Sequence, residues 1–394
     1  MNNDIKKLLG LQSIWINKWK IYDNKVKIFC RSPKTQCMCP HCTCTTKRIH
    51  SIKIRKVKHS IWQEKEVVLY LKVRRFYCKK CNKAFTEYIQ GIDKKRTTKN
   101  YRTILLKQLS RSSLTYTSQT TKSSSSVLYS VLRENREITK DINWKKQGTN
   151  LTIGIDEHSF QGRKMALTLT NISKGKLMNV LKNDRKDTLD NWLKTVDSKR
   201  ISEVCIDMRR MFLYSVEEYL PEAKIVVDKF HVVAYANKAM DEVRSIIVPK
   251  RKVRQLLFKS KEKLSKAERL KLQGIFEEFK MYPSLYQSYF IKEKLRSFYL
   301  LRDKKEARRQ LNNIIMFCEE SKSKYVKGFG RTLVFWRKYI LNYFNNYSTN
   351  AYTEGVHTKI KMLKRVSFGF RNIDNYIAKI TLGFLPFILE VHTF

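Results

Sequence analysis

The sequence predicts a multidomain protein that combines α+β and α/β parts, and three patterns lead to this fold class. Two Cys-x-x-Cys pairs flank a segment in which apolar and polar residues alternate, which is typical of β-structure built around zinc. From residue 150 onward, short apolar runs of strand length alternate with segments of helical periodicity. Residues 249–335 show only helical, highly charged patterns.

The charge balance indicates a nucleic-acid partner. The 394 residues include 81 Lys and Arg against 35 Asp and Glu, which gives a formal charge of +46. The cations run from end to end and are interleaved with aromatic residues, which favours an extended nucleic-acid surface over a single basic tail. The alternative is that the protein is rich in Lys and Arg through a general compositional bias and binds no nucleic acid. The 42% of hydrophobic residues allow a sizeable core.

Nothing in the sequence predicts a membrane protein. No apolar run approaches the roughly 20 residues that a membrane-spanning helix needs, and the run FLPFIL near the C-terminus is far too short. Charges interrupt the apolar residues of the N-terminus, which lacks a cleavage-like signal. We therefore expect a cytoplasmic protein whose nine cysteines are reduced, so that clustered cysteines bind metal.

Residues 1–95 are expected to form strands and a zinc ribbon, with residues 56–76 as a β-hairpin or meander. Four thiolates hold one zinc ion and leave no coordination position for chemistry, so the zinc would be structural. Cys37 or Cys44 could replace one of the expected zinc ligands if the first cysteine pair is shifted by two residues. Cysteines that bind no zinc, as free thiols or a redox pair, are the other alternative. The expected ligands are Cys39, Cys42, Cys78 and Cys81. The basic residues expected to lie on phosphate are Lys72, Arg74, Arg75, Lys79, Lys80 and Lys83.

Residues 96–140 are predicted to form a helix-turn-helix. Apolar residues recur with a spacing near 3.6 in the first and last parts, and a turn rich in Ser and Thr separates them. The small polar residues at the start of the second helix would meet phosphates and base edges. A serine-rich linker before a single helix is the alternative. These serines are Ser123, Ser124 and Ser125.

Residues 150–248 are predicted to begin the core of the protein. The predicted order is three strands, helix, strand, helix, strand, helix, which is the order of an RNase H-like domain. Residues 249–335 would be an all-helical insertion, for which a separate coiled coil or linker is the alternative. Residues 336–394 would complete the core. The predicted strands are 151–160, 163–172, 176–183, 201–208 and 223–232, and the predicted helices are 187–196, 211–220 and 232–247.

Carboxylates at strand ends predict a divalent-metal site in this core. Asp156 follows the apolar run 151–155 and Asp207 ends the fourth strand, which should be its neighbour. A helix that begins near residue 350 would bring Glu354 to the same edge. Three anions at one place require hard cations, and oxygen ligands suit magnesium or manganese. Two such ions activate a water or a DNA 3′-hydroxyl for attack on phosphate.

Other residues near these carboxylates have competing interpretations. Asp228 also ends a strand, and we expect it beside the metal ligands or facing DNA. His231 would contact the DNA near the scissile bond or cap a helix. Glu157 and His158 should point away from the site.

The helix that begins near residue 350 shows two stripes. Val356, Ile360 and Leu363 should face inward, while Glu354, Thr358, Lys361 and Arg365 share another face, with Lys361 and Arg365 on DNA. Gly355 costs this helix up to ~1 kcal/mol, which a close approach of metal or DNA would rationalise.

The segments GIDEHSF, CIDM, VVDKFHV and NAYTEGVHTKIKMLKRVSFGFRN resemble the DDE insertion-sequence transposases of the ISL-three family. A zinc ribbon followed by a helix-turn-helix also matches that family's layout, so the resemblance covers nearly the whole chain. It implies that Asp156, Asp207 and Glu354 are the catalytic triad and that residues 249–335 form the insertion before the glutamate.

The resemblance also implies an activity and its partners. The protein would bind terminal inverted repeats and would cut and join double-stranded DNA at transposon ends and target, with two Mg²⁺ or Mn²⁺ ions per active site. It would act as a homodimer or larger assembly at the bacterial nucleoid. Two alternatives differ in class: a structure-specific nuclease or resolvase would hydrolyse without joining, and a transposase-derived regulator would bind without cutting.

Overall fold

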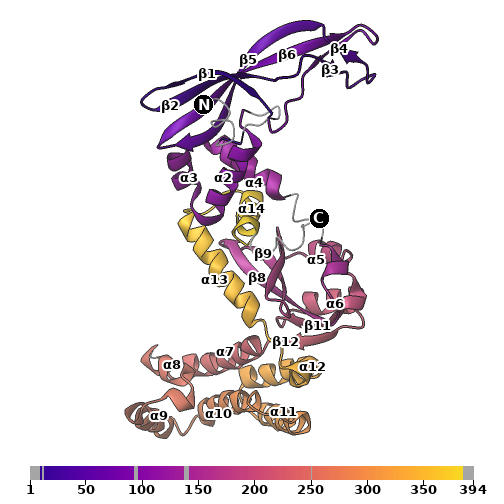
Figure 1. The fold of residues 1–394 in the computed structure, drawn as a ribbon. Coiled ribbons are helices and arrows are strands. Elements are labelled where there is room, and N and C mark those ends of the chain that lie inside the picture. Colours follow the sequence, from indigo (N-terminus) through magenta and orange to yellow (C-terminus); the bar gives the residue numbers. More distant parts are fainter. Residues whose placement is uncertain (1–8, 11–12, 93–95, 137–141, 250, 385–394) are drawn as a thin grey trace. The chain divides into compact units, whose positions relative to one another are not determined.

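The computed structural model describes residues 9–10, 13–92, 96–136, 142–249 and 251–384. The chain divides into an N-terminal unit, residues 1–140 with 361–386, and a central unit, residues 141–360 with 387–394 (Figure 1). The run FLPFIL, residues 384–389, lies outside the described residues except for its first position. In the part of the chain that is described, no helix combines the length and apolarity needed to cross a membrane.

The N-terminal unit contains a five-stranded sheet built from the alternating residues before position 90. Its strands are β1 (Trp15–Ile21), β2 (Lys25–Arg31), β5 (Ile49–Trp62), β6 (Lys65–Cys78) and β7 (Lys83–Thr86), in the order β1-β2-β6-β5 with β7 beside β6. Gln63 and Glu64 both have positive φ, as a tight hairpin turn between β5 and β6 requires. The predicted hairpin is therefore confirmed.

Four helices of the same unit pack together. They are α2 (Lys99–Arg111), α3 (Leu114–Thr121), α4 (Ser125–Arg136) and α14 (Ile373–Gly383). Ala378 and Leu382 of α14 join a core with Leu105 and Leu128. Buried Lys379 donates to the carbonyl oxygens of Leu109 and Ser112, where α2 ends. Residues 361–386 thus belong to the N-terminal unit, whereas the sequence assigned all of 336–394 to the core.

The central unit contains a mixed sheet with the strand order β10-β9-β8-β11-β12. Its elements in chain order are β8 (Leu151–Gln161), β9 (Lys164–Asn171), β10 (Lys176–Leu181), α5 (Lys186–Leu193), β11 (Ile201–Ile206), α6 (Arg210–Tyr219), β12 (Lys224–Val227) and α7 (Lys229–Ile247). This is the predicted succession of strands and helices. β8, β11 and β12 are parallel, whereas β9 and β10 are antiparallel additions.

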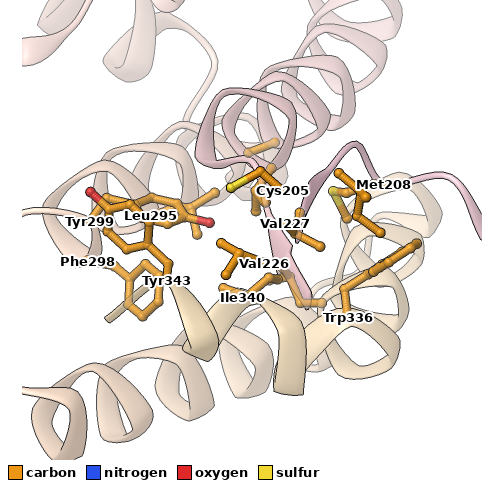
Figure 2. Packing of buried hydrophobic residues seen from close by; sticks show 14 of the residues in the cluster. Cys205, Met208, Val226, Val227, Leu295, Phe298, Tyr299, Trp336, Ile340 and Tyr343 are labelled. Carbon is orange, nitrogen blue, oxygen red and sulfur yellow. The ribbon is translucent and has the colours of Figure 1, made fainter. Parts of the chain in front are cut away.

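Helices follow this sheet, as the sequence predicts for residues 249–335. They are α8 (Arg251–Phe258), α9 (Lys266–Glu278), α10 (Pro283–Phe298), α11 (Lys304–Glu319) and α12 (Lys324–Asn346), so the helical region extends beyond residue 335. α10 and α12 pack on α7, and α12 also packs on β12. Val226 and Val227 of β12 lie against Ile340 and Tyr343 of α12 (Figure 2). The helical region therefore supports one side of the sheet.

Candidate active site

Three aspartates lie at one edge of the central sheet. Ile155 of β8 pairs with Ile206 of β11, and Ile206 pairs with Val227 of β12, all in parallel register. The next residue in each case is an aspartate, within β8 or directly after β11 and β12, so three carboxylates lie beside one another. Their side chains are buried, with exposures of 6% for Asp156, 5% for Asp207 and 0% for Asp228.

β8 matches the predicted strand 151–160, so Asp156 lies within its strand, and only its expected place at a strand end is wrong. β8 continues to Gln161 because residues 157–161 still pair with β9. The parallel pairing with β11 nevertheless stops at Ile155, while Asp207 directly follows β11. The expected proximity of Asp156 and Asp207 therefore holds, because β8 and β11 are neighbours at the centre of the sheet.

His231, on the first turn of α7, completes a group of possible metal ligands. Among the described residues, ligand atoms of Asp156, Asp207 and His231 lie within 4.8 Å of one another. His231 Nε2 is 3.0 Å from Asp207 Oδ1. Burial lowers the pKa of His231, but the hydrogen bond to Asp207 and the nearby carboxylates outweigh it and raise the pKa to about 9. Burial, followed by the charge of Asp207, raises the pKa of Asp156 to about 8.

Asp228 adds a third buried carboxylate that the sequence analysis ranked behind Asp207. Neither of its carboxylate oxygens has a hydrogen-bond partner among the described residues. Burial raises the pKa of Asp228 to about 6, and the charges of Asp207 and Glu354 act in the same direction. Buried carboxylates without partners are costly unless a cation neutralises them, so this donor set fits a hard divalent ion.

The N-terminus of α13 (Ala351–Val366) packs directly on β8 and β9. A Cβ atom added to Gly154 would lie 2.6 Å from Thr353 Oγ1 and 2.7 Å from both Asn350 Oδ1 and Thr170 Oγ1. Asn350 donates to the carbonyl oxygen of Ile155, at 3.3 Å, and the hydroxyls of Thr353 and Thr170 are 2.7 Å apart. Glycine at position 154 therefore permits this close approach beside Asp156.

His357, one turn into α13, reaches the same carboxylate and was missed in the sequence. Its Nδ1 is 3.4 Å from Asp156 Oδ2, and its Nε2 is 2.9 Å from Thr168 Oγ1. Thr168 Oγ1 is also 2.8 Å from His158 Nδ1, so His158 lies in this buried polar cluster rather than away from the site. The available signal was helical spacing, since Thr353, Val356, His357 and Ile360 form the buried stripe of α13.

Glu354 lies in the first turn of α13 but outside the group of ligand atoms. It is exposed, together with Thr358, Lys361 and Arg365. Val356, Ile360 and Leu363 are buried, so the two predicted stripes of this helix are confirmed. A Cβ atom added to Gly355 would have no atom of the described residues within 4 Å, so packing against them does not require glycine there. Of the three predicted metal ligands, the structure thus brings two together, and the third remains a prediction.

Glu157 points away from the carboxylate group, as expected. It forms an ion pair with Arg209, which also binds Asp184 Oδ2 at 3.2 Å. Arg209 follows Asp207 by two residues, and its backbone N–H donates to the carbonyl oxygen of Asp207 at 2.7 Å. These contacts fix the turn that carries Asp207.

Four cysteines converge in the N-terminal unit, and they are the predicted zinc ligands. The Sγ atoms of Cys39 and Cys81 are 3.6 Å apart, and those of Cys42 and Cys78 are 3.4 Å apart. Four thiolates at the usual Zn–S distance are about 3.8 Å apart, so the set fits zinc. A backbone hydrogen bond from Cys81 contributes most to lowering the pKa of Cys78 to about 7.

The alternative zinc ligands lie outside that group. Cys37 belongs to β3 (Cys37–Met38), which pairs with β4 (Thr45–Thr46), and Cys44 immediately precedes β4. Neither is part of the four-cysteine group. The geometry therefore favours Cys39, Cys42, Cys78 and Cys81 over a register that uses Cys37 or Cys44.

The residues predicted to bind DNA fall into two groups. Arg74 forms an ion pair with Glu87, at 2.6 Å, and buried Ser123 shares a 2.8 Å hydrogen bond with Tyr101, so both are engaged within the fold. His231 lies among the carboxylates, as described above. The others are exposed: Lys72, Arg75, Lys79, Lys80, Lys83, Ser124, Ser125, Lys361 and Arg365.

Comparison with known proteins gives matches in both units. The family model of ISL-three DDE proteins, described as a transposase, matches residues 153–380, and one described as the zinc-finger of transposase IS204/IS1001/IS1096/IS1165 matches residues 26–81. The chain is 25% identical over 199 residues to the transposase for insertion sequence element IS1001 of Bordetella parapertussis, covering 48% of each chain. It is 26% identical over 262 residues to the transposase for insertion sequence element IS1557 of Mycobacterium tuberculosis, covering 57% of this chain and 58% of the relative. The matches thus span about half the length of these relatives.

Proposed function

Because the chain belongs to the ISL-three family of transposases, we propose that it binds terminal inverted repeats and then cuts and joins DNA strands. The observation that carries this proposal is the meeting of Asp156 and Asp207 at a buried sheet edge, in a chain with a formal charge of +46. Buried paired carboxylates need cations, and a basic surface attracts the phosphates of DNA.

In this proposal the central unit is an RNase H-like catalytic domain. The strand order β10-β9-β8-β11-β12 and the parallel pairing of β8, β11 and β12 support this assignment. Asp156 and Asp207 hold Mg²⁺ or Mn²⁺, and exposed Glu354 supplies the third carboxylate. Bound divalent ions would activate a water or 3′-hydroxyl and stabilise the leaving oxygen. His231 orients Asp207 through their ion-pair contact, and His357 positions Asp156 in the same way.

The N-terminal unit supplies DNA recognition in this proposal. Helices α3 and α4 are joined by a short turn in which Lys122 is left-handed, which supports a helix-turn-helix. Exposed Ser124 and Ser125 at the start of α4 would meet the DNA, together with the basic flank of the zinc ribbon. Joining two transposon ends brings at least two copies together on DNA, so we propose a homodimer or larger assembly acting at the nucleoid.

The test is metal-dependent cleavage of a duplex carrying the repeats that flank the coding region. Asp156→Asn, Asp207→Asn and Glu354→Gln should abolish cleavage and strand transfer while leaving binding to the duplex intact. Exposed Asp187, in the first turn of α5, provides a control, since Asp187→Asn makes the same chemical change away from the site. Cleavage that persists in any of the three variants would remove that residue from the active site, and hydrolysis without joining would favour a nuclease.

A further inference from the structure

We propose that the outward face of the N-terminal sheet binds the phosphate backbone of duplex DNA, in addition to the zinc ribbon and α4. The inference rests on the proposed function only in taking DNA as the partner. Four strands, in the order β1-β2-β6-β5, form this face, which we call the basic face. The opposite face covers the N-terminal core, with Val26, Ile28 and Leu69.

Strand register places the side chains of the basic face. Phe29 of β2 lies beside Tyr70 of β6, with their ring centroids 5.1 Å apart. On the neighbouring strands, the residues that pair with these two aromatic residues include Lys18 and Lys56. Most residues that pair with the next outward-facing positions are also cationic. The cations of the basic face are exposed or half-buried and include Lys18, Lys20, Lys27, Arg31, Lys56 and Lys72.

Aromatic rings hold several of these cations on the face. Lys27 Nζ lies 4.5 Å from the ring centroid of Tyr22 and 5.7 Å from that of Tyr70, which Lys56 also approaches to 5.7 Å. Lys18 Nζ lies 5.2 Å from the centroid of Phe29. Cation–π contacts restrict long side chains before any ligand binds, so less conformational entropy is lost when a phosphate arrives.

Little negative charge offsets these cations. The four strands contain a single acidic residue, Glu66, and it lies at one end of the face, where Lys58 approaches it to 2.5 Å. Carboxylates within these strands therefore neutralise very little of the positive charge. A concentration of like charge on one face repels itself, and binding of polyanion with release of its counterions relieves this repulsion.

The shape of the face favours a duplex over an unpaired strand. Neighbouring strands lie about 4.8 Å apart, so the outer strands β1 and β5 are separated by about 14 Å. This is comparable with the roughly 12 Å width of the major groove, so the cations can reach phosphates on both sides of it. Lysines lie over the rings of Phe29 and Tyr70, which leaves these rings poorly placed to stack on unpaired bases.

Contacts within the N-terminal unit tie the basic face to the helices. Lys122, in the turn before α4, donates from Nζ to the carbonyl oxygen of Glu64 at 2.8 Å, and Lys58 donates to the carbonyl oxygen of Lys122. Glu64 belongs to the turn between β5 and β6. The start of α4 and one end of the basic face are therefore held together, which suits simultaneous contact with one duplex.

The experiment measures how binding depends on salt. The full chain and its Lys18→Gln/Lys27→Gln/Lys56→Gln variant are titrated, at several salt concentrations, with a terminal-repeat duplex, with a scrambled duplex of equal length and with one strand of the repeat as a single-stranded probe. Each phosphate contact contributes about 0.9 to the slope of log K against log salt, so the variant should lose about 2.7 from the slope. Because backbone contacts carry no sequence information, affinity for both duplexes should fall by the same factor.

Two controls separate local contact from net charge and from misfolding. The Lys→Arg triple variant at the same positions should keep the wild-type slope. A charge-matched control changes three exposed lysines of the helical region near Glu262 and Glu268, and it should also keep the wild-type salt slope. These changes are Lys263→Gln, Lys266→Gln and Lys271→Gln. An unchanged slope in the first variant, or a loss confined to a single-stranded probe, would overturn the proposal. If the wild-type protein shows no preference for the terminal repeat, the proposed function fails while the slope still reports on the basic face.

Discussion

The contact between β8 and α13 leaves no room for a side chain at residue 154, so Gly154→Ala perturbs the candidate active site sharply. The new Cβ would lie 2.6 Å from Thr353 Oγ1, whereas ordinary contacts begin near 3.4 Å. The start of α13 must therefore move away by about 0.8 Å, a shift that also strains the hydrogen bonds of Thr353 and Asn350. Overpacking together with buried polar groups that lose partners costs about 2–4 kcal/mol of unfolding free energy.

The same displacement should reduce catalysis, because α13 carries Glu354 and His357. Misplacement of catalytic groups by about 1 Å costs on the order of 100-fold in rate. We expect urea unfolding, followed by tryptophan fluorescence, to show the loss of stability, and Mg²⁺-dependent cleavage at saturating DNA to show the loss of rate. Gly355→Ala is the matched control. Open space surrounds Gly355, so alanine there should stabilise the helix by up to ~1 kcal/mol and preserve cleavage.

One outcome would refute this reasoning. A Gly154→Ala protein within about 0.5 kcal/mol of wild-type stability, the usual range for neutral substitutions, would mean that α13 does not press on β8. Weaker DNA binding by Gly355→Ala, despite a more stable helix, would instead indicate that DNA approaches the open side of this glycine.

Four further predictions concern other parts of the molecule. Cys39→Ser should lose the bound zinc, whereas Cys37→Ser should retain one ion per chain in a colorimetric release assay. Burial lowers the pKa of Lys379 from its ordinary 10.5 to about 8 in the folded protein. Between pH 8 and 10.5, Lys379 is therefore protonated in the unfolded chain but largely neutral in the folded protein. Stability should therefore rise with pH over this window, and Lys379→Met should flatten the rise in urea titrations. Asp228→Asn should raise the thermal midpoint of the metal-free protein, because it removes a buried carboxylate without a hydrogen-bond partner among the described residues. In the absence of DNA, Glu354→Gln should leave Mn²⁺ affinity unchanged and Asp207→Asn should lower it, as measured by paramagnetic resonance titration.

Local patterns in the sequence were sufficient for much of the fold. Alternation predicted the β5–β6 hairpin, and apolar spacing predicted the succession of strands and helices through α7. Features that depend on distant partners were not predictable. α14 lies in the N-terminal unit and not in the core, because Lys379 and its apolar neighbours pack on α2, far away in sequence.

The same distinction applies to the candidate site. Asp156 and Asp207 could be predicted to meet because the ends of parallel neighbouring strands share an edge. Arg74 and Ser123 were assigned to DNA from residue type alone, but their partners Glu87 and Tyr101 hold them within the fold. Only the tertiary structure shows such pairings, since any basic or small polar residue in a basic chain is consistent with DNA contact.

The difference between the buried aspartates and exposed Glu354 follows from the cost of burying charge. Asp156, Asp207 and Asp228 are largely shielded from water, and His231 lies 3.0 Å from Asp207 as one nearby cationic group, so a divalent cation would lower the cost of burying these carboxylates. Glu354 remains in contact with water and carries no such penalty without metal. In the proposed mechanism the aspartates would therefore form the cation site, and the exposed glutamate on α13 would complete the coordination when metal and DNA bind. A pattern of acidic residues in a sequence cannot separate these two roles, because they differ in burial alone.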